Sequence, residues 1–238
     1  MQKQYIYQTG TINSLLEAVY AGDTSMEQML QHGDFGLGAL DNIDGELIIH
    51  EGVCYRADAT GKLHILDKDI HTPFAVVNKF IPEQKFTVKD LDFKSLEAVV
   101  AEHFISSNLI YAIRVTGKFQ HLDLRSEHCT CRPYKRLTEI LPNLQTTFIA
   151  NNVSGVMVGV WFPKYMAQLN VPGFHFHFID DFCKIGGHVF GFQLEEATIE
   201  LQVLHGFQLA LIENQDFYQA NLNIQNESAV ASVEQVRT

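Results

Sequence analysis

Three histidines stand close together in a segment that also carries alternating phenylalanines: Phe174-His175-Phe176-His177-Phe178 and, further along, Gly186-Gly187-His188. Successive side chains of a β-strand point to opposite faces, so His175 and His177 would share one face and the phenylalanines the other. Residues 180–187 supply turn residues that would fold the next strand back antiparallel. With His177 opposite His188, their Cβ atoms would lie about 5 Å apart. Three neutral imidazoles that converge in this way suit a zinc ion with an open fourth position, as in catalytic sites.

Other interpretations of this histidine group stay open from the pattern alone. An H-x-H strand is more often part of a hairpin whose histidines face solvent, and zinc in a purely structural β-domain would only clamp the hairpin. A cupin-type metalloenzyme also carries H-x-H on a strand, but it normally adds a glutamate a few residues later and a distant third histidine. Here Asp180 and Asp181 stand at that place, and His188 is too close in sequence.

The cysteines offer a weaker metal motif. His128-Cys129-Thr130-Cys131 could bind a soft metal, but its two cysteines are not separated by the two residues of common zinc motifs, and the chain has no second cysteine pair to complete a site. This favours unliganded thiols in a loop. Four cysteines are too sparse for a disulfide framework in a chain of this length, which indicates reduced thiols of a cytoplasmic protein. No G-x-x-x-x-G-K or G-x-G-x-x-G pattern supports nucleotide or flavin binding.

Composition and charge exclude several classes of partner. The chain has 238 residues, 28 of them acidic and 17 basic, for a formal net charge of −11. A phosphate backbone requires a basic footprint, so we expect no nucleic-acid partner. The longest mostly apolar run, residues 153–162, is about half of the roughly 20 residues that span a bilayer, and the N-terminus shows no secretory signal. We therefore predict cytoplasmic localisation and no membrane partner.

The elements that must position the histidines follow from periodicity. Apolar spacing predicts helices over 11–20, 25–31 and 92–104 and a helical turn over 164–169. Short apolar stretches between Asp-Gly, Glu-Gly and Thr-Gly-Lys turns predict an antiparallel meander over 34–67. Strands are expected over 47–55, 63–66, 109–116 and 119–125, the last two joined as a hairpin at Gly117-Lys118, and over 147–150, 156–162, 173–179, 188–194 and 200–213.

Each half of the chain combines a helix with several strands, which is consistent with an internal duplication. We predict an α/β fold of the α+β type, in which two packed sub-domains are built on mainly antiparallel or mixed β-sheets with a few helices. The N-terminal mixed-sheet sub-domain would span residues 1–142, and the C-terminal metal-binding β sub-domain residues 143–238. Residues 221–238 are polar and are expected to form a loose tail.

A longer pattern surrounds the histidines. Residues 162–178 read FPKYMAQLNVPGFHFHF and are followed by Asp180-Asp181 and Gly186-Gly187-His188-Val189. Upstream stand Gly33-Asp34-Phe35-Gly36-Leu37-Gly38, Asp44-Gly45-Glu46, Arg125 and Pro133-Tyr134. These blocks closely resemble those of the acetolactate decarboxylase family, from about Gly33 to Glu234. The sequence departs from the family pattern at Ala39, where many members carry threonine, and between Arg125 and Pro133.

The resemblance implies a site and an activity. The three histidines would hold zinc, and a glutamate, an arginine and a C-terminal glutamate of the family fall on Glu46, Arg125 and Glu234. Local pattern alone indicates ordinary polar positions for all three, because Glu46 follows an Asp-Gly turn, Arg125 shares a strand face with His121 and Asp123, and Glu234 lies in a polar tail.

The implied reaction is the zinc-dependent decarboxylation of 2-acetolactate to acetoin and CO2, with zinc as the Lewis acid for the enediolate. In that reaction Arg125 would hold the carboxylate or lie beside the enediolate, Glu46 would relay the proton, and Glu234 would close the site or supply an oxygen to zinc. The family is usually dimeric, so we expect a homodimer.

Overall fold

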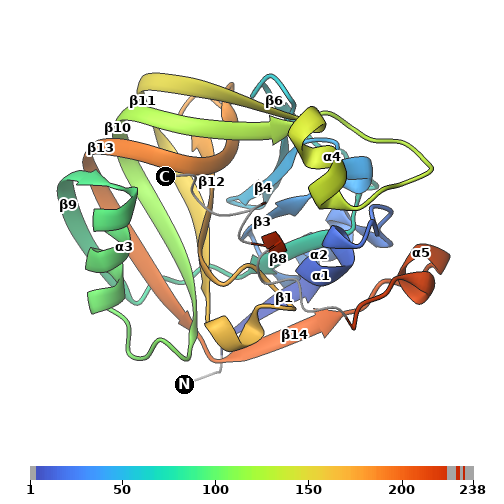
Figure 1. Cartoon of the computed structure of the whole chain (residues 1–238). Coiled ribbons are helices and arrows are strands. Elements are labelled where there is room, and N and C mark those ends of the chain that lie inside the picture. The colour runs from blue at the N-terminus through green and yellow to red at the C-terminus, as the bar shows by residue number, and fades with distance from the viewer. Residues whose placement is uncertain (1–3, 224–228, 231–232, 234–238) are drawn as a thin grey trace.

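Two β-sheets carry most strands of the structure, a computed structural model that describes residues 4–223, 229–230 and 233 (Figure 1). The seven-stranded sheet has the order β14-β1-β8-β3-β4-β5-β6, and the five-stranded sheet has the order β10-β11-β12-β13-β9. All adjacent strands are antiparallel except β1 and β14, which pair in parallel. The predicted α+β fold on mainly antiparallel or mixed sheets is therefore confirmed.

The seven-stranded sheet contains the predicted meander. Its strands are β1 (Tyr5–Thr9), β3 (Phe35–Ala39), β4 (Glu46–His50), β5 (Val53–Ala57), β6 (Leu63–Ile65), β8 (Phe74–Asn78) and β14 (Gly206–Ala210). β3, β4, β5 and β6 follow one another as neighbours in space and in sequence. The strand expected over 47–55 is in fact β4 and β5, which are joined by a turn at Glu51-Gly52, where both residues have positive φ.

The five-stranded sheet is built from longer strands: β9 (Gln84–Asp92), β10 (Ile110–Glu127), β11 (Gln145–Phe162), β12 (Gly173–Asp180) and β13 (Gly186–Leu204). β10 pairs with both β11 and β13, and β12 pairs with the same two strands, so these four strands close into a ring. The strands expected separately over 147–150 and 156–162 are both part of the single strand β11. β13 likewise runs unbroken through the expected gap at 195–199.

The hairpin predicted at Gly117-Lys118 is wrong. β10 passes straight through this position, and Gly117 pairs with Gly155 on one side and with Ala197 on the other. A Cβ atom on Gly117 would lie only 2.6 Å from the Cβ atom of Ala197. The glycine therefore permits close approach of two strands, and the same residue type that marks turns in a sequence serves packing here.

The predicted helices begin where their capping residues stand. Thr11 and Ser25 form capping boxes at α1 (Ile12–Leu16) and α2 (Met26–His32), and the Asp92 side chain caps α3 (Phe93–Glu102). The helical turn near 164 is the 3-10 helix η2 (Lys164–Met166). The remaining elements are β2 (Thr24–Ser25), η1 (Asp41–Ile43), β7 (His71–Thr72), α4 (Leu137–Leu144) and α5 (Gln215–Gln219), of which α4 was not predicted.

Residue 142 does not separate the two sheets. β9 and β10 precede this position and belong to the five-stranded sheet, whereas β14 follows it and pairs with β1 of the seven-stranded sheet. Pro142 itself lies inside α4. The predicted division at 142/143 and the division between the sheets differ because pairing partners far apart in sequence decide which sheet a strand joins. The internal duplication stays a prediction.

Apolar side chains from both sheets meet in one cluster between them, which includes Leu37, Ile48, Val158, Val160 and Ile179. A second cluster fills the inside of the five-stranded sheet and is covered by α3 (Figure 1). Phe174, Phe176 and Phe178 belong to this second cluster, as alternation predicted. The opposite face of β12, which carries His175 and His177, therefore points toward the seven-stranded sheet.

The described part of the C-terminal region is packed, unlike the predicted loose tail. Val230 and Val233 are 2 % and 3 % exposed, in a cluster with Ile12 of α1 and Leu141 of α4. The Asn13 side chain also donates a hydrogen bond to the Leu222 carbonyl, at 2.9 Å. Among the described residues, no helix is both long enough and apolar enough to cross a membrane.

Candidate active site

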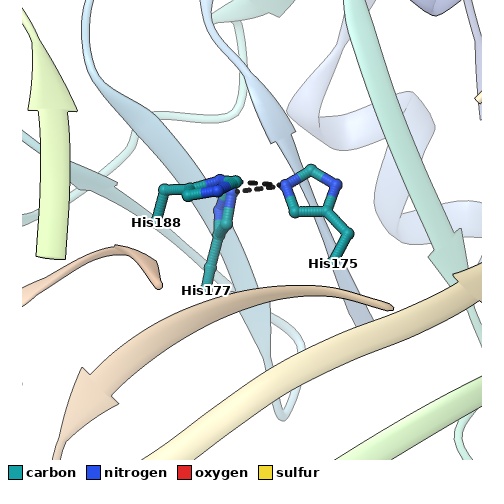
Figure 2. A group of neighbouring side chains, drawn as sticks. All are labelled: His175, His177 and His188. Atoms are coloured by element: carbon teal, nitrogen blue, oxygen red, sulfur yellow. Dashed lines mark hydrogen bonds between the residues drawn. The ribbon is translucent and has the colours of Figure 1, made fainter. Parts of the chain in front are cut away.

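The three histidines converge on one point (Figure 2). His177 of β12 lies directly opposite His188 of β13, which is the register considered from the sequence. Nε2 of His175 is 3.1 Å from Nε2 of His177 and 3.1 Å from Nδ1 of His188. All three side chains are buried, which rules out the interpretation of a hairpin with solvent-facing histidines.

The protonation of these imidazoles suits a cation. Nδ1 of His177 lies 2.8 Å from the Leu47 carbonyl oxygen, which can only accept, so Nδ1 carries the proton and Nε2 carries the lone pair. Burial, with smaller contributions from His177 and Arg125, holds the pKa of His175 well below its ordinary value. His175 is therefore a neutral imidazole, the form in which histidine binds metals.

The spacing of the nitrogens suits zinc as well. Two nitrogens bound to a tetrahedral zinc ion at about 2.0–2.1 Å lie about 3.3 Å from each other. The donor atoms of the three histidines all lie within 4.8 Å of one another, and within the described residues this is the one group of at least three such side chains that could hold a metal. Cys129 and Cys131 are exposed free thiols outside this group, as the sequence favoured.

Glu46 joins the histidines to an arginine. It opens β4 directly after Gly45, whose φ of 84° makes the tight turn that the Asp-Gly pair predicted. The Glu46 side chain is buried, with Oε2 at 3.3 Å from Nε2 of His177 and Oε1 at 3.4 Å from Nη2 of Arg125. Ala39 of β3, where the sequence departs from the family pattern, pairs with Glu46 of β4.

Arg125 lies near the end of β10, and its backbone pairs with that of His188. Arg125 is 2 % exposed, whereas the side chains of His121 and Asp123 on the same strand face are 39 % and 50 % exposed. Nη1 of Arg125 donates a hydrogen bond to the Val233 carbonyl at 2.5 Å. The structure thus brings Glu46 and Arg125 to the three histidines. Glu234 lies outside the described residues, directly after Val233.

Two neighbours of Arg125 were missed from the sequence. Glu127 is 4 % exposed, and its Oε1 lies 2.9 Å from Nε of Arg125. Phe190 covers the guanidinium, with its ring centre 4.8 Å from the Arg125 Cζ and 5.0 Å from the centre of the His188 ring. Strand alternation from Arg125 would have placed Glu127 on the same face, and this signal was available.

No sequence signal marks Phe190. Leu124 pairs with Val189 and Asp123 with Gly191, so Phe190 is the extra residue of a β-bulge in β13. The bulge turns the Phe190 ring toward His188 and Arg125. Phe190 also lines a surface cavity of about 580 Å³ together with Asp123, Thr147 and Ile149.

Fold and site together define an α+β protein of two packed sheets, with a metal-type group of three histidines beside a buried glutamate–arginine pair. The family model for alpha-acetolactate decarboxylase matches residues 6–224. The chain therefore belongs to the alpha-acetolactate decarboxylase family.

Individual relatives agree with this assignment. The alpha-acetolactate decarboxylase of Brevibacillus brevis is 36 % identical over 236 residues, which covers 99 % of this chain and 82 % of the relative. That of Klebsiella aerogenes is 36 % identical over 231 residues, covering 96 % and 88 %. The crystal structure of alpha-acetolactate decarboxylase from Bacillus subtilis strain 168 superposes with a TM-score of 0.94 at 32 % identity, covering 97 % of this chain and 99 % of that one. The similarity therefore extends over both sheets.

Proposed function

We propose that the protein converts 2-acetolactate to acetoin and CO2 with a zinc ion held by His175, His177 and His188. The observation that carries this proposal is the convergence of three buried imidazole nitrogens beside the Glu46–Arg125 pair. A zinc ion there would supply Lewis-acid stabilisation of the negative charge that develops when CO2 leaves.

The substrate sets what the other residues must do. 2-Acetolactate is a β-keto acid whose carboxylate-bearing carbon also carries a hydroxyl group. When the bond to the carboxylate carbon breaks, its electron pair moves toward the ketone and gives an enediolate. One proton must then reach the carbon that lost CO2. The site therefore has to orient a carboxylate, exclude water and deliver a proton.

Arg125 is the residue that we assign to the substrate carboxylate. A guanidinium presents its N–H groups in a planar fork that matches a carboxylate. The buried position of Arg125 strengthens such an interaction because little water competes for it.

Glu46 is the residue that we assign to proton transfer, because its carboxyl group lies between His177 and Arg125 and reaches both. The proton would pass from the Glu46 carboxyl group to the carbon, and the carboxylate would be reprotonated from solvent. Glu234 stays a prediction for closing the site or adding an oxygen ligand.

A non-catalytic zinc clamp explains the histidines but gives no reason for a buried ion pair beside them. A cupin-type enzyme would place its third histidine far along the chain, whereas His188 follows on the next strand. Homodimer formation and cytoplasmic localisation stay predictions.

The test is a colorimetric acetoin assay on the purified protein with acetolactate as substrate. We expect acetoin release that is lost after treatment with a chelator and restored by added zinc. Zinc-loaded protein that releases no acetoin would contradict the activity. Full activity after complete metal removal would contradict the role of zinc.

A further inference from the structure

Glu127 is a buried carboxyl group at the candidate site that the proposed function does not use. It follows Arg125 by two residues on the same face of β10 and is 4 % exposed. Its Oε1 lies 2.9 Å from Nε of Arg125, and a hydrogen bond joins its carboxyl group to that of Glu46. Glu127 thus contacts both residues that we assign to the substrate.

The contacts of Arg125 restrict its guanidinium from several directions. Glu127 holds the Nε edge, the Val233 carbonyl accepts from Nη1, and Glu46 faces Nη2. Phe190 lies against the plane of the group. Rotation about the Cδ–Nε bond would break the hydrogen bond from Nη1 to the Val233 carbonyl and the contact of Nη2 with Glu46, while the Glu127 carboxyl group holds the Nε end of the guanidinium as an ion pair.

The backbone of this part of β10 is also anchored. Ser126, between Arg125 and Glu127, donates a hydrogen bond from Oγ to the Ala57 carbonyl at 2.7 Å. Ala57 pairs with Glu46 on the neighbouring strand β5. β10, which carries Arg125 and Glu127, is therefore hydrogen-bonded to β5, and β5 pairs with β4, which carries Glu46. This pairing holds the backbones of Arg125, Glu127 and Glu46 next to one another.

Glu46 and Glu127 are two carboxyl groups in contact beside one arginine. Two carboxyl groups in hydrogen-bond contact cannot both be ionised without strong repulsion. Burial and the nearby Glu46 raise the pKa of Glu127 to about 8, although Arg125 acts in the opposite direction. The Glu127 carboxyl group therefore keeps its proton to a higher pH than an exposed glutamate does.

We propose that Glu127 is a positioning residue that fixes the Arg125 guanidinium in the orientation that binds the substrate carboxylate. This inference rests on the proposed function, because it needs Arg125 to receive that carboxylate. A residue that only neutralised a buried arginine would contribute to folding and would leave carboxylate recognition unchanged.

Three variants separate these roles. Glu127→Ala removes the contact, and Glu127→Asp draws the carboxyl group back from Arg125. Glu127→Gln keeps an oxygen beside Nε of Arg125 and a donor for Glu46, so it mimics the protonated glutamate. We expect Glu127→Ala and Glu127→Asp to raise the KM for acetolactate about tenfold, while Glu127→Gln stays within about threefold of the wild type.

Binding to the zinc-loaded protein, measured by calorimetry, gives a readout without turnover. The probes are 2-hydroxy-2-methylbutanoate, which has the carboxylate but no ketone, and acetoin, which has no carboxylate. Glu127→Asp should weaken the hydroxy acid about tenfold and change acetoin less than about twofold. The zinc content should equal that of the wild type.

Glu200→Ala is the matched control, because Glu200 pairs with Arg114 between β10 and β13, at 2.7 Å and away from the histidines. It should lower the thermal midpoint and leave both affinities unchanged.

Wild-type affinity for the hydroxy acid in Glu127→Asp would overturn the inference, as would an equal loss of hydroxy acid and acetoin. If Glu127→Ala does not fold, the contrast between Glu127→Asp and Glu127→Gln still decides. Failure of the wild type to release acetoin would instead count against the proposed function.

Discussion

Glu46 and His177 belong to different sheets, yet Oε2 of Glu46 lies 3.3 Å from Nε2 of His177. The next residue of β4, Leu47, accepts a hydrogen bond from the other ring nitrogen of the same histidine, at 2.8 Å. One strand of the seven-stranded sheet therefore contacts both nitrogens of a candidate metal ligand on the five-stranded sheet. The site exists only where the two sheets pack together.

The histidine assignment predicts metal content. His175→Ala, His177→Ala and His188→Ala should each lose most of the bound zinc, because three protein ligands are the usual minimum of a catalytic zinc site. Elemental analysis of the purified variants measures this directly. His121→Ala, which changes a partly exposed histidine that contacts Asp123, should keep the zinc of the wild type. Full zinc occupancy in all three site variants would mean that the ligands lie elsewhere.

Arg125→Lys tests the planar fork. Lysine keeps the positive charge but loses the fork, so one or more charge-assisted hydrogen bonds should fail, and kcat/KM should fall about tenfold to hundredfold. Zinc content should not change. Arg114→Lys alters the other arginine of β10 that pairs with a glutamate, and it should leave kcat/KM as in the wild type. Equal kinetics for wild type and Arg125→Lys would remove Arg125 from the mechanism.

Glu46→Gln tests proton delivery. The amide keeps the shape of the side chain but cannot donate and regain a proton as an acid, so kcat should fall about hundredfold or more while KM changes little. Steady-state kinetics on zinc-loaded protein separate the two constants. Glu51→Gln, at the exposed turn after β4, is the control and should behave as wild type. A variant that loses affinity but keeps its kcat would assign Glu46 to binding instead.

The sequence was informative wherever the chemistry follows local periodicity. Alternation alone separated His175 and His177 from the phenylalanines, and the turn residues before His188 correctly predicted an antiparallel return strand. The family pattern supplied Glu46 and Arg125, whose local surroundings indicated ordinary polar positions. Their burial depends on contacts between sheets, which no local pattern contains.

What the sequence could not give depends on long-range pairing. Gly117 has the residue type of a turn, and only its two strand partners reveal it as a point of close approach. Phe190 faces the site because a bulge shifts the register of β13, and a bulge of this kind leaves no residue signature. The boundary at 142 differs from the sheet boundary for the same reason, since β10 finds its partners later in the chain.

The raised pKa of Glu127 leads to a prediction of how stability depends on pH in the metal-free protein. Its pKa is raised from an ordinary 4.5 to about 8 in the folded state, so the folded protein binds more protons than the unfolded chain between these values. The stabilising contribution is complete below the unfolded pKa and is lost as the pH rises through about 8. The thermal midpoint of chelator-treated protein should fall between pH 6 and pH 9, and Glu127→Gln should show a smaller fall. Parallel pH curves for the two proteins would contradict this account.

Variants of the C-terminal residues should show that the thermal midpoint and the turnover depend on different residues. A truncation ending at Ser232 removes the Val233 side chain, whose burial contributes about 1.5–3 kcal/mol, and the carbonyl that accepts from Arg125. Its thermal midpoint and its acetoin production should therefore both fall. Glu234→Ala keeps Val233 in place, so the thermal midpoint should stay near that of the wild type while turnover drops, if Glu234 acts at the site as proposed. Gln235→Ala serves as the neighbouring control and should change neither quantity. Normal acetoin production by Glu234→Ala would limit the role of this segment to the contact between Val233 and Arg125.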